Sequence, residues 1–544
     1  MTSQQTPPGG RGESAAPRGE SAAPRGPFPA ALPVATGAEA VDFDLRAQHG
    51  GIPGAVLMES AGRAAAELAV NLAPQGPLVV LVGAGNNGGD ALVAARTLTA
   101  WGRDVRLVCV PPHPAADPRL HGWRLPHLTA ADDALSVHLD AAALVIDGLL
   151  GTGLKGPPRS ETAALIDVVN AAAVRVLALD VPSGVIADTG QVPGAAIRAD
   201  CTLAFGWPKL GTLIGPGRMF VGRLLAAEIG FPPLPEGAFW ARLLTPEWAA
   251  AVCPRRSVDT HKKAVGSLTL VAGSPGMAGA ALLSGRAALR SGAGYLRVLS
   301  AAANREIVQT SLPDALWADL DNPALVHEAL TAAGAVAAGP GLGRDAHAEA
   351  ALTALLDGPA TALVLDADAL NLLAEGRPRS IAALGATRPI VLTPHPGEAA
   401  RLLELTVAEV QADRPAAVRE LARRSLCTVV LKGMPSLVSD PRGLVDIAAP
   451  ASSELAVAGM GDVLTGTIGA LLAQGATPRD AAGLALLAGA SAARACALGA
   501  GLAASDVPDR LPAALAGFAA CAGFRAEPSE LRFPWLTLDL EAPR

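Results

Sequence analysis

PLVVLVGAGNNGGDAL, residues 77–92, decides the fold of the first half of the chain. The six residues at its start are typical of a buried strand, and the glycines that follow end the strand and lead into a helix over 88–100. A strand, a glycine-rich turn and a helix in this order place backbone N–H groups where a phosphate can bind. Because Asn86, Asn87 and Asp90 lie among the glycines, the turn also offers amide and carboxylate oxygens, which suit a cation or a sugar hydroxyl.

Residues 83–88 match the pattern G-x-G-x-x-G of dinucleotide sites that serve hydride transfer. That pattern also requires an acidic residue at the end of the second strand, where it binds the ribose hydroxyls. Here the second strand, 104–110, is followed by Pro111 and Pro112, and its acid, Asp104, lies at the beginning. No Gly-Lys-Ser/Thr follows the turn, which excludes a Walker loop. The turn therefore predicts a dinucleotide site for chemistry other than hydride transfer.

Strands and helices alternate along most of the chain. After a proline-rich connection that runs from 231 to about 260, the alternation restarts, and it ends in alanine-rich helices from Asp462 to about 521. Such alternation predicts an α/β protein with parallel sheets that are covered by helices on both faces. The expected divisions are a disordered tail over 1–33, a first domain over 34–240, a second domain over 241–525, and a C-terminal tail or edge strand over 526–544.

The composition argues against several classes of function. The chain has 43 basic and 50 acidic residues, so its net charge of -7 gives no electrostatic reason to bind nucleic acid or an anionic membrane. No uncharged apolar run reaches the roughly 20 residues of a membrane span. The tandem RGESAAP repeat at 11–24 is typical of a disordered tail. Six scattered cysteines without CxxC spacing are typical of a reducing compartment, so we expect a cytoplasmic protein.

Acidic residues follow two further strands of the first domain. Asp147 precedes GLLGTGLKGPP, and Asp180 precedes VPSG. Because the carboxyl ends of parallel strands form the ligand crevice of an open sheet, Asp90, Asp147 and Asp180 are expected at one rim. A single acid at a strand end most often caps a helix or a turn. Three acids beside one glycine-rich turn exceed what packing needs and predict a ligand site.

Four segments of the first domain, LMESAGRA, GAGNNGGD, DGLLGTGLKGPP and DVPSG, resemble the epimerase domain of the NAD(P)H-hydrate repair system. The resemblance implies a Rossmann-like parallel-sheet domain in which Asp180 binds the substrate and acts as the acid/base group. It also implies a potassium ion held by Asn87, Asp147 and Ser183. Ala91 stands where the family usually has Gly, which predicts slight crowding of the turn. The residues that the resemblance assigns to the hydrated dinucleotide are Asn86, Asn87, Gly88, Gly89, Asp90, Gly151, Thr152, Gly153, Leu154, Lys155, Gly156, Pro157 and Asp180.

The most informative motif of the second domain is AGMGDVLTG, residues 458–466. Gly461 at the start of a helix offers backbone donors and the positive end of the helix dipole to a phosphate. Asp462 beside it can deprotonate a hydroxyl that attacks this phosphate, or it can cap the helix, and the two roles are compatible. Lys432 after CTVVL can reach a nucleotide phosphate or lie solvated in its loop. His395 in LTPHPGE is either functional or structural.

These motifs, together with HKKAVGSLTLVAGSPGMAGAAL, GPGLG and LDADALN, resemble the dehydratase domain of the same repair system, a branch of the ribokinase-like superfamily. The resemblance implies a ribokinase-like αβα domain with Asp462 as the base. Met460 stands where the family usually has Ser or Thr, so a hydroxyl contact is lost. The adenine nucleotide is expected to contact Lys432, Gly433, Met434, Pro435, Ser436 and Gly461. The hydrated dinucleotide is expected to contact Ala280, Gly341 or Gly343, His395 and Asp462.

The two resemblances together predict a bifunctional metabolite-repair enzyme. The first domain would interconvert the R and S epimers of hydrated NADH and NADPH, called NADHX and NADPHX. The second would phosphorylate the C6 hydroxyl of the S epimer from ADP, with magnesium on the phosphates, and phosphate would then leave to restore NAD(P)H. Relatives form larger assemblies, so we expect a homo-oligomer. Two alternatives stay open: a small-molecule kinase with a dinucleotide-sensing domain, and a non-catalytic binding module.

Overall fold

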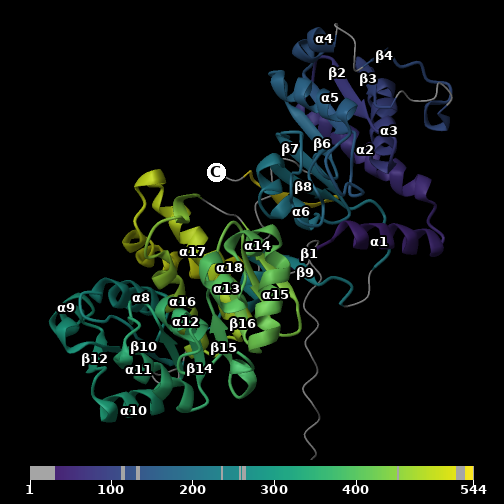
Figure 1. Ribbon diagram of the computed structural model, residues 1–544. Coiled ribbons are helices and arrows are strands. Elements are labelled where there is room, and N and C mark those ends of the chain that lie inside the picture. Colours follow the sequence, from purple (N-terminus) through teal and green to yellow (C-terminus); the bar gives the residue numbers. More distant parts are fainter. Residues whose placement is uncertain are drawn as a thin grey trace, which may run out of the picture.

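The computed structural model of the chain has two sheets, each flanked by helices, within the residues that it describes. The first domain lies at the top of Figure 1 in purple and blue, and the second lies below it in teal, green and yellow. This is the α/β class that the alternation predicts. The tandem repeat at 11–24 lies outside the described residues. The described residues are 31–111, 117–129, 135–233, 237–255, 259, 265–449, 453–521 and 533–542.

The first domain is built on a sheet of eight strands. Its strands are β2 (Leu78–Val82), β3 (Val105–Cys109), β4 (His127–Leu128), β5 (Leu144–Gly148), β6 (Val176–Leu179), β7 (Cys201–Phe205), β8 (Arg223–Ala227) and β19 (Leu536–Leu540). Its helices are α1 (Gly37–His49), α2 (Gly54–Leu72), α3 (Asn86–Ala100), α4 (Leu135–Ala141), α5 (Ser160–Ala171) and the short α6 (Leu210–Leu213), with the 3-10 turns η1 (Pro118–Leu120) and η2 (Gly217–Phe220).

Helices cover both faces of this sheet, which explains the unbroken apolar run at its centre. Successive side chains of a strand point to opposite faces. Val80 of β2 packs in the cluster that contains α2 and α3, whereas Val79 and Leu81 pack in the cluster that contains α4 and α5. The strand order is β19-β8-β7-β6-β5-β2-β3-β4, and the direction of the connections reverses at β2. Such a reversal places the ligand crevice of a parallel sheet at the carboxyl ends of β2 and β5.

The second domain has an eleven-stranded sheet in the order β1-β9-β18-β17-β16-β15-β14-β13-β10-β11-β12. Its strands are β1 (Ala31–Val34), β9 (Ala241–Leu244), β10 (Ser267–Val271), β11 (Tyr295–Ser300), β12 (Ala315–Asp319), β13 (Ala335–Ala338), β14 (Ala362–Leu365), β15 (Ile390–Leu392), β16 (Thr428–Leu431), β17 (Ser436–Ser439) and β18 (Val445–Ala448). Its helices are α7 (Pro246–Val252), α8 (Ala278–Arg290), α9 (Arg305–Ser311), α10 (Pro323–Thr331), α11 (Ala346–Asp357), α12 (Ala367–Ala374), α13 (Pro396–Leu403), α14 (Val407–Ala412), α15 (Arg414–Ser425), α16 (Met460–Ala473), α17 (Pro478–Cys496) and α18 (Leu511–Cys521). Here the connections reverse at β10, which lies between β11 and β13.

Each sheet has an edge strand that is distant in the chain from the rest of that sheet. β1 pairs antiparallel with β9 at the edge of the second sheet, and β19 pairs antiparallel with β8 at the edge of the first. The yellow strand β19 therefore lies in the upper domain in Figure 1. Residues 31–33, which the sequence placed in a tail, thus begin a strand, and β19 forms the edge strand that the sequence left as one of two alternatives.

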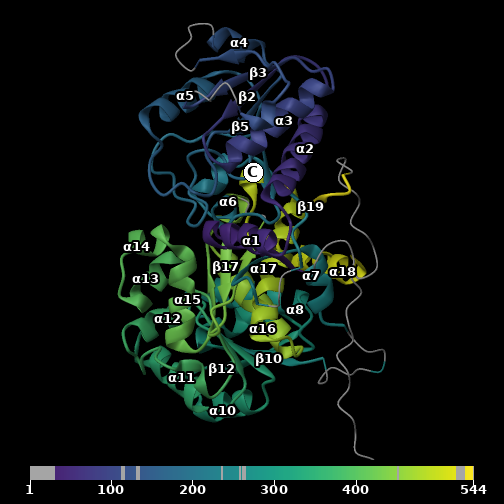
Figure 2. The same ribbon diagram turned by 90° about the vertical axis from the view of Figure 1, so that its right-hand side faces the viewer.

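The two domains share one continuous hydrophobic cluster. Leu210 and Leu213 of α6 belong to the same buried cluster as Leu32 of β1 and Leu243 of β9. The next residue after β1, Ala35, donates its N–H to the Pro208 carbonyl and accepts from the Leu210 N–H. α1 follows directly and lies at the boundary between the domains in Figure 2. The chain therefore passes from the second sheet straight onto the first domain.

Trp535 fixes the last strand to the first domain. Its Nε1 donates to Glu67 Oε2 at 2.6 Å, and its ring stacks on Phe533 with centroids 4.5 Å apart.

Replacing Trp535 by Ala should lower the free energy of unfolding of the first domain by about 2 kcal/mol, because a half-buried ring and its hydrogen bond are lost. Calorimetry should show a lower melting temperature for that domain. Trp101→Ala, whose residue is 46% exposed, is the control, and equal shifts for both variants would contradict the assignment.

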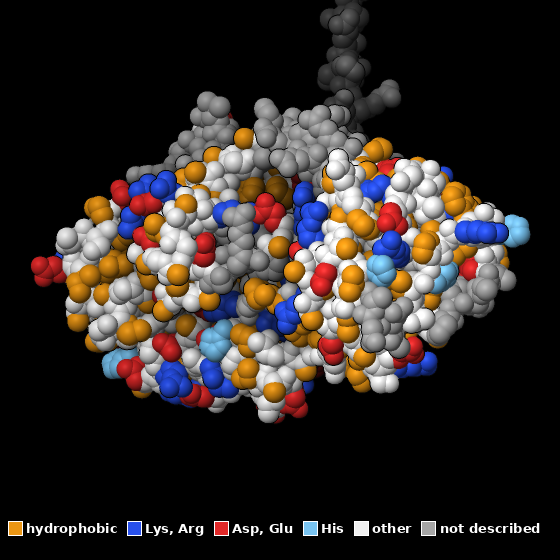
Figure 3. Space-filling view, turned by 90° about the horizontal axis from the view of Figure 1, so that it is seen from above, with side chains coloured by type: hydrophobic (Ala, Val, Ile, Leu, Met, Phe, Trp, Pro, Cys, Tyr) orange, Lys and Arg blue, Asp and Glu red, His pale blue; other side chains and the backbone are white. Residues whose placement is uncertain are grey.

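Acidic and basic side chains are mixed on the surface. On the face seen from above, Lys and Arg are interspersed with Asp, Glu and hydrophobic side chains (Figure 3). Among the described segments, no helix combines the length and the hydropathy that a membrane span requires.

Two candidate active sites

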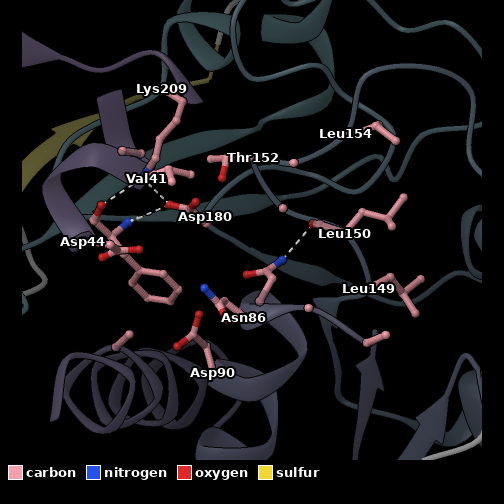
Figure 4. A pocket seen from close by; sticks show the side chains of 18 of the residues that line it. Val41, Asp44, Asn86, Asp90, Leu149, Leu150, Thr152, Leu154, Asp180 and Lys209 are labelled. Carbon is pink, nitrogen blue, oxygen red and sulfur yellow. Dashed lines mark hydrogen bonds and ion pairs between the residues drawn. The ribbon is translucent and has the colours of Figure 1, made fainter. Parts of the chain in front are cut away.

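The glycine-rich turn after β2 borders a cavity of about 800 Å³ at the carboxyl edge of the first sheet. α1, α3 and the residues that follow β5 and β6 also line it. In Figure 4, Asp44 and Asp180 lie near Lys209, Asp90 lies below them across an open space with its carboxyl directed towards them, and Thr152 lies above. Two of these acids, Asp90 and Asp180, are among the strand-end acids that the sequence predicts at one rim.

Close backbone packing explains two of the glycines in the turn. A Cβ atom on Gly88 would lie 1.9 Å from the Gly83 carbonyl oxygen, and one on Gly83 would lie 1.8 Å from the Leu149 carbonyl oxygen. The helix begins at Asn86, two residues earlier than predicted. Ala91 is fully buried in the core and does not line the cavity.

A buried lysine holds Asp180. Asp180 has a φ of 63°, in the left-handed region that residues other than glycine rarely adopt. Its Oδ1 accepts a hydrogen bond from Phe205 N at 3.1 Å and forms an ion pair with Lys209 Nζ. Lys209 is 3% exposed and also donates to the Phe205 carbonyl at 2.8 Å. The sequence does not single out Lys209, and its only signal is a lysine among the apolar residues of GWPKLGTL.

Asn87, Asp147 and Ser183 meet below the turn. Ser183 Oγ donates to Asp147 Oδ1 at 2.6 Å, and Ser183 N donates to Asp147 Oδ2 at 2.8 Å. Burial raises the pKa of Asp147 to about 6, although these hydrogen bonds lower it. Asn87 Nδ2 donates to the Leu150 carbonyl at 2.8 Å, which Ser183 Oγ also reaches at 3.3 Å. Asn87 Oδ1 is buried and has no partner among the described residues, so it is available to a bound cation or water.

The remaining dinucleotide-binding candidates of the first domain fall into two groups. Gly88, Gly89, Lys155 and Gly156 are not part of the cavity lining. The candidates that do line the cavity are Asn86, Asn87, Asp90, Gly151, Thr152, Gly153, Leu154, Pro157 and Asp180.

The second site lies at the carboxyl ends of β14, β15 and β16. Lys432 Nζ donates to Asp366 Oδ1 at 2.7 Å and lies 3.8 Å from Glu398 Oε2. Thr465 Oγ1 of α16 donates to Asp366 Oδ2 at 2.9 Å. Asp366 and Glu398 are 1% and 4% exposed, so Lys432 neutralises acids that have little water around them. Glu398 and Thr465 lie within the motifs LTPHPGE and AGMGDVLTG, but the sequence does not single them out, and their contacts emerge only from the fold.

The N-terminus of α16 lies directly over this ion pair. A Cβ atom on Gly461 would lie 3.4 Å from both Asp366 Oδ2 and Lys432 Nζ. Asp462 follows in the first turn of the helix. Burial and the charge of Asp366 raise the pKa of Asp462 to about 7, against the effect of Lys432. Asp462 can therefore both hold and release a proton near neutral pH.

His395 acts as a helix cap. Its Nδ1 accepts hydrogen bonds from Gly397 N at 2.9 Å and Glu398 N at 3.3 Å, and His395 N donates to Glu398 Oε2 at 2.8 Å. Its side chain is 51% exposed. Burial, Lys432 and Arg401 lower its pKa, which keeps the ring neutral and able to accept the capping bonds. The capping bonds show that His395 has a structural role. Because half of its side chain is exposed, it can also contact a ligand.

The glycine turn after β13 and the turn before α8 lie side by side at the second site. Gly341 adjoins Ala280, because a Cβ atom on Gly341 would lie 3.0 Å from the Ala280 Cβ. Gly343 N donates to Asp368 Oδ2 at 2.8 Å. Ala280 and the glycines after β13 thus lie together, as the sequence predicts for one ligand.

A buried arginine supports the loop that carries Lys432. Arg414 is 5% exposed, and its Nη2 donates to the Pro435 carbonyl at 2.9 Å. Within the loop, Gly433 N donates to Ser436 Oγ at 3.3 Å. Burial lowers the pKa of Arg414 to about 10, so the guanidinium stays charged at neutral pH. The loop Lys432–Ser436 is thus fixed from below, while Met434 at its tip is 40% exposed.

Comparisons with known proteins match both halves of the chain. The model of the family described as YjeF-related protein N-terminus matches residues 54–211, and that of NAD(P)H-hydrate dehydratase matches residues 268–513. The bifunctional NAD(P)H-hydrate repair enzyme of Moorella thermoacetica is 38% identical over 80% of this chain and 86% of its own length. The enzyme of the same name from Escherichia coli is 37% identical over 78% and 82%. The ADP/ATP-dependent NAD(P)H-hydrate dehydratase of Bacillus subtilis, co-crystallised with ATP and Mg²⁺, is 31% identical over 50% of this chain and 97% of its own, with a TM-score of 0.45.

Proposed function

Since the chain belongs to the family of bifunctional NAD(P)H-hydrate repair enzymes, we propose that it repairs NADHX and NADPHX by epimerisation in the first domain and ADP-dependent dehydration in the second. One observation carries the proposal. Each acid that the chemistry requires, Asp180 or Asp462, lies at the carboxyl edge of its own sheet near a lysine, Lys209 or Lys432.

In the first domain, the turn Asn86–Asp90 and the loop Gly151–Pro157 would bind the dinucleotide, with the N-terminus of α3 directed to its phosphates. Asp180 would act at the hydrated carbon C6. Its Oδ1 forms an ion pair with Lys209 Nζ, which holds the carboxyl at the edge of the cavity. Lys209 and the Phe205 N–H fix the direction of this carboxylate, because both bind the same oxygen.

In the second domain, Asp462 would remove the proton of the C6 hydroxyl while the oxygen attacks the terminal phosphorus of ADP. Lys432 and the backbone of Gly461 would stabilise the transferred phosphate. The products of this step are AMP and a phosphate ester at C6. Loss of a proton from C5 and departure of phosphate from C6 then restore the double bond of NAD(P)H. The glycines after β13 and Ala280 would position the nicotinamide end.

Both implied metals suit the oxygen atoms that the two sites offer. Asn87 Oδ1, the Asp147 carboxylate and Ser183 Oγ are hard oxygen donors, and Asn87 Oδ1 has no partner among the described residues. These three residues would hold potassium, which would supply a positive charge beside the buried Asp147. In the second domain, Asp366 and Glu398 are buried oxygen donors beside Lys432. They would face magnesium on the nucleotide phosphates, where the ion would offset phosphate charge.

A mixture of the two NADHX epimers and ADP provides the test. The absorbance of reduced nicotinamide should return in a fast phase from the S epimer and then in a slow phase as the R epimer is converted. Recovery of only the S fraction, without a slow phase, would contradict the epimerase activity. Accumulation of a stable phosphate ester would favour the kinase alternative. Rates of both reactions no higher than the uncatalysed rates would favour the binding-module alternative. The homo-oligomer stays a prediction.

Potassium should raise the melting temperature of the first domain. A cation that binds only the folded state stabilises it by about 2.7 kcal/mol at a concentration 100 times its Kd. Calorimetry in KCl, compared with tetramethylammonium chloride of equal ionic strength, measures this effect without any turnover. Asn87→Ala should abolish the difference, because it removes the unpaired oxygen. An undiminished potassium effect in this variant would place the ion elsewhere.

A further inference from the structure

Asp90 is a buried carboxyl that lines the cavity. Packing alone does not explain why a carboxyl lies there. It is 8% exposed, and none of the described residues gives its carboxyl a hydrogen bond or an ion pair. A carboxyl that faces a cavity without a protein partner is free to bind or react with a ligand there. Asp90 lines the cavity, and in Figure 4 its carboxyl points towards the side where Asp180 lies.

The contacts and charges around Asp90 differ from those around Asp180. Burial raises the pKa of Asp90 well above its usual range, and the nearby carboxylates Asp180 and Asp44 raise it further. The cations Lys209 and Arg119 oppose this rise but lie too far away to bind the carboxyl. Asp180 takes the direct contact with Lys209 instead. These four groups, on α1, η1 and the segments after β6 and β7, are the charged side chains that act on Asp90. Pairs of carboxyls whose environments differ in this way commonly divide the acid and base roles of a reaction.

We propose that Asp90 is a second catalytic residue of the epimerase, the general acid that acts on the face of the nicotinamide ring opposite to Asp180. The inference rests on the proposed function. C6 of the substrate carries a hydroxyl and is bonded to N1, so the hydroxyl can leave if it is protonated and the N1 lone pair assists. Inversion then requires one proton donor and one acceptor on opposite faces of the ring.

The steps balance with these two groups alone. The Asp90 carboxyl gives its proton to the hydroxyl oxygen, the C6–O bond breaks, water leaves, and the N1 lone pair forms an N1=C6 double bond. Water then adds to the other face of C6 and gives a proton to the Asp180 carboxylate, while the π electrons return to N1. The product is the opposite epimer, with Asp90 ionised and Asp180 protonated. The same two groups in exchanged roles carry the reverse reaction, and proton exchange with solvent restores the starting state.

The test compares the full-length wild-type protein with Asp90→Asn, which keeps the shape of the side chain but cannot donate the proton. We expect kcat of epimerisation to fall by about 100-fold or more with little change in KM, as for loss of a general acid. The wild-type rate should also decline at alkaline pH, and the variant should lose this decline. Asp90→Glu should restore part of the rate. In H₂¹⁸O, each wild-type epimerisation should place one ¹⁸O at C6.

Dehydration of the pure S epimer is the internal control, because it uses the second domain and should be unchanged in Asp90→Asn. Asp44→Asn, which removes the neighbouring carboxyl, should keep the alkaline decline. If the wild type epimerises but Asp90→Asn keeps its kcat, or changes only KM, the acid role of Asp90 is refuted and the proposed function stands. Epimerisation without ¹⁸O incorporation also refutes it. A wild type that does not interconvert the epimers refutes both.

Discussion

Replacing Asp462 by Asn should lower kcat of dehydration by about 10²–10⁴-fold, the range for loss of a general base. The substitution keeps the size of the side chain and its place in the first turn of α16, so Lys432 and Gly461 should still bind the nucleotide. KM for ADP should change little, and epimerisation in the first domain should be unchanged. Asp480→Asn, in the first turn of the next helix, is the matched control. A dehydration rate within a few-fold of wild type would contradict a base role for Asp462.

The same assignment fixes the sign of the pH dependence. Burial and Asp366 raise the pKa of Asp462 to about 7, and the base works only when it has lost its proton. The dehydration rate should therefore be low at pH 5, rise through about pH 7 and level off above it. In Asp462→Asn this rise should disappear from the residual rate.

Replacing Asp180 by Asn should lower kcat of epimerisation by about 10²–10⁴-fold and leave dehydration of the S epimer unchanged. Asparagine is the appropriate substitution, because the φ of 63° at this position is tolerated better by Asn than by Ala. The variant also leaves Lys209 buried without its counter-charge, so some loss of stability is expected. Asp167→Asn, at an exposed position of α5, is the control.

In the mixed-epimer assay, Asp180→Asn should recover only the S fraction of the absorbance on the timescale of the fast phase. The remaining fraction should return at the rate of the uncatalysed epimerisation. A slow phase as fast as that of the wild type would show that Asp180 has no catalytic role. The melting temperature of the first domain should be measured alongside, to separate a loss of activity from a loss of folding.

The sequence predicts those parts of the two sites that belong to strand ends and glycine turns. Asp147 lies near the end of the buried strand β5 and Asp180 directly follows β6, and the ends of neighbouring parallel strands necessarily meet at one edge. The sequence predicts Gly461 and Asp462 in the same way, because a glycine turn that begins a helix places its backbone N–H groups at the site. The resemblance adds roles to these residues, because their order and spacing match along both domains.

The partners that tune these acids are not predictable in the same way. Lys209 reaches Asp180 because the segment after β7 is held by hydrogen bonds to Ala35, a residue far away in the chain. Asp44 reaches the cavity on α1, which precedes all strands of the first sheet in the chain. Lys432 and Asp366 are far apart in the chain and meet only across β14, β15 and β16. Periodicity and motif spacing describe single segments, whereas these contacts depend on how segments are stacked.

The exchange of edge strands has a consequence for synthesis on the ribosome. The outer edge of β8 in the first sheet cannot pair until β19 has been synthesised, and β19 follows the entire second domain in the chain. During translation the first domain therefore presents an open strand edge, the kind of surface that pairs with other chains. β1 in turn emerges early and stays unpaired until β9 has been made. Nascent chains stalled within the second domain should consequently be more prone to associate than the finished protein.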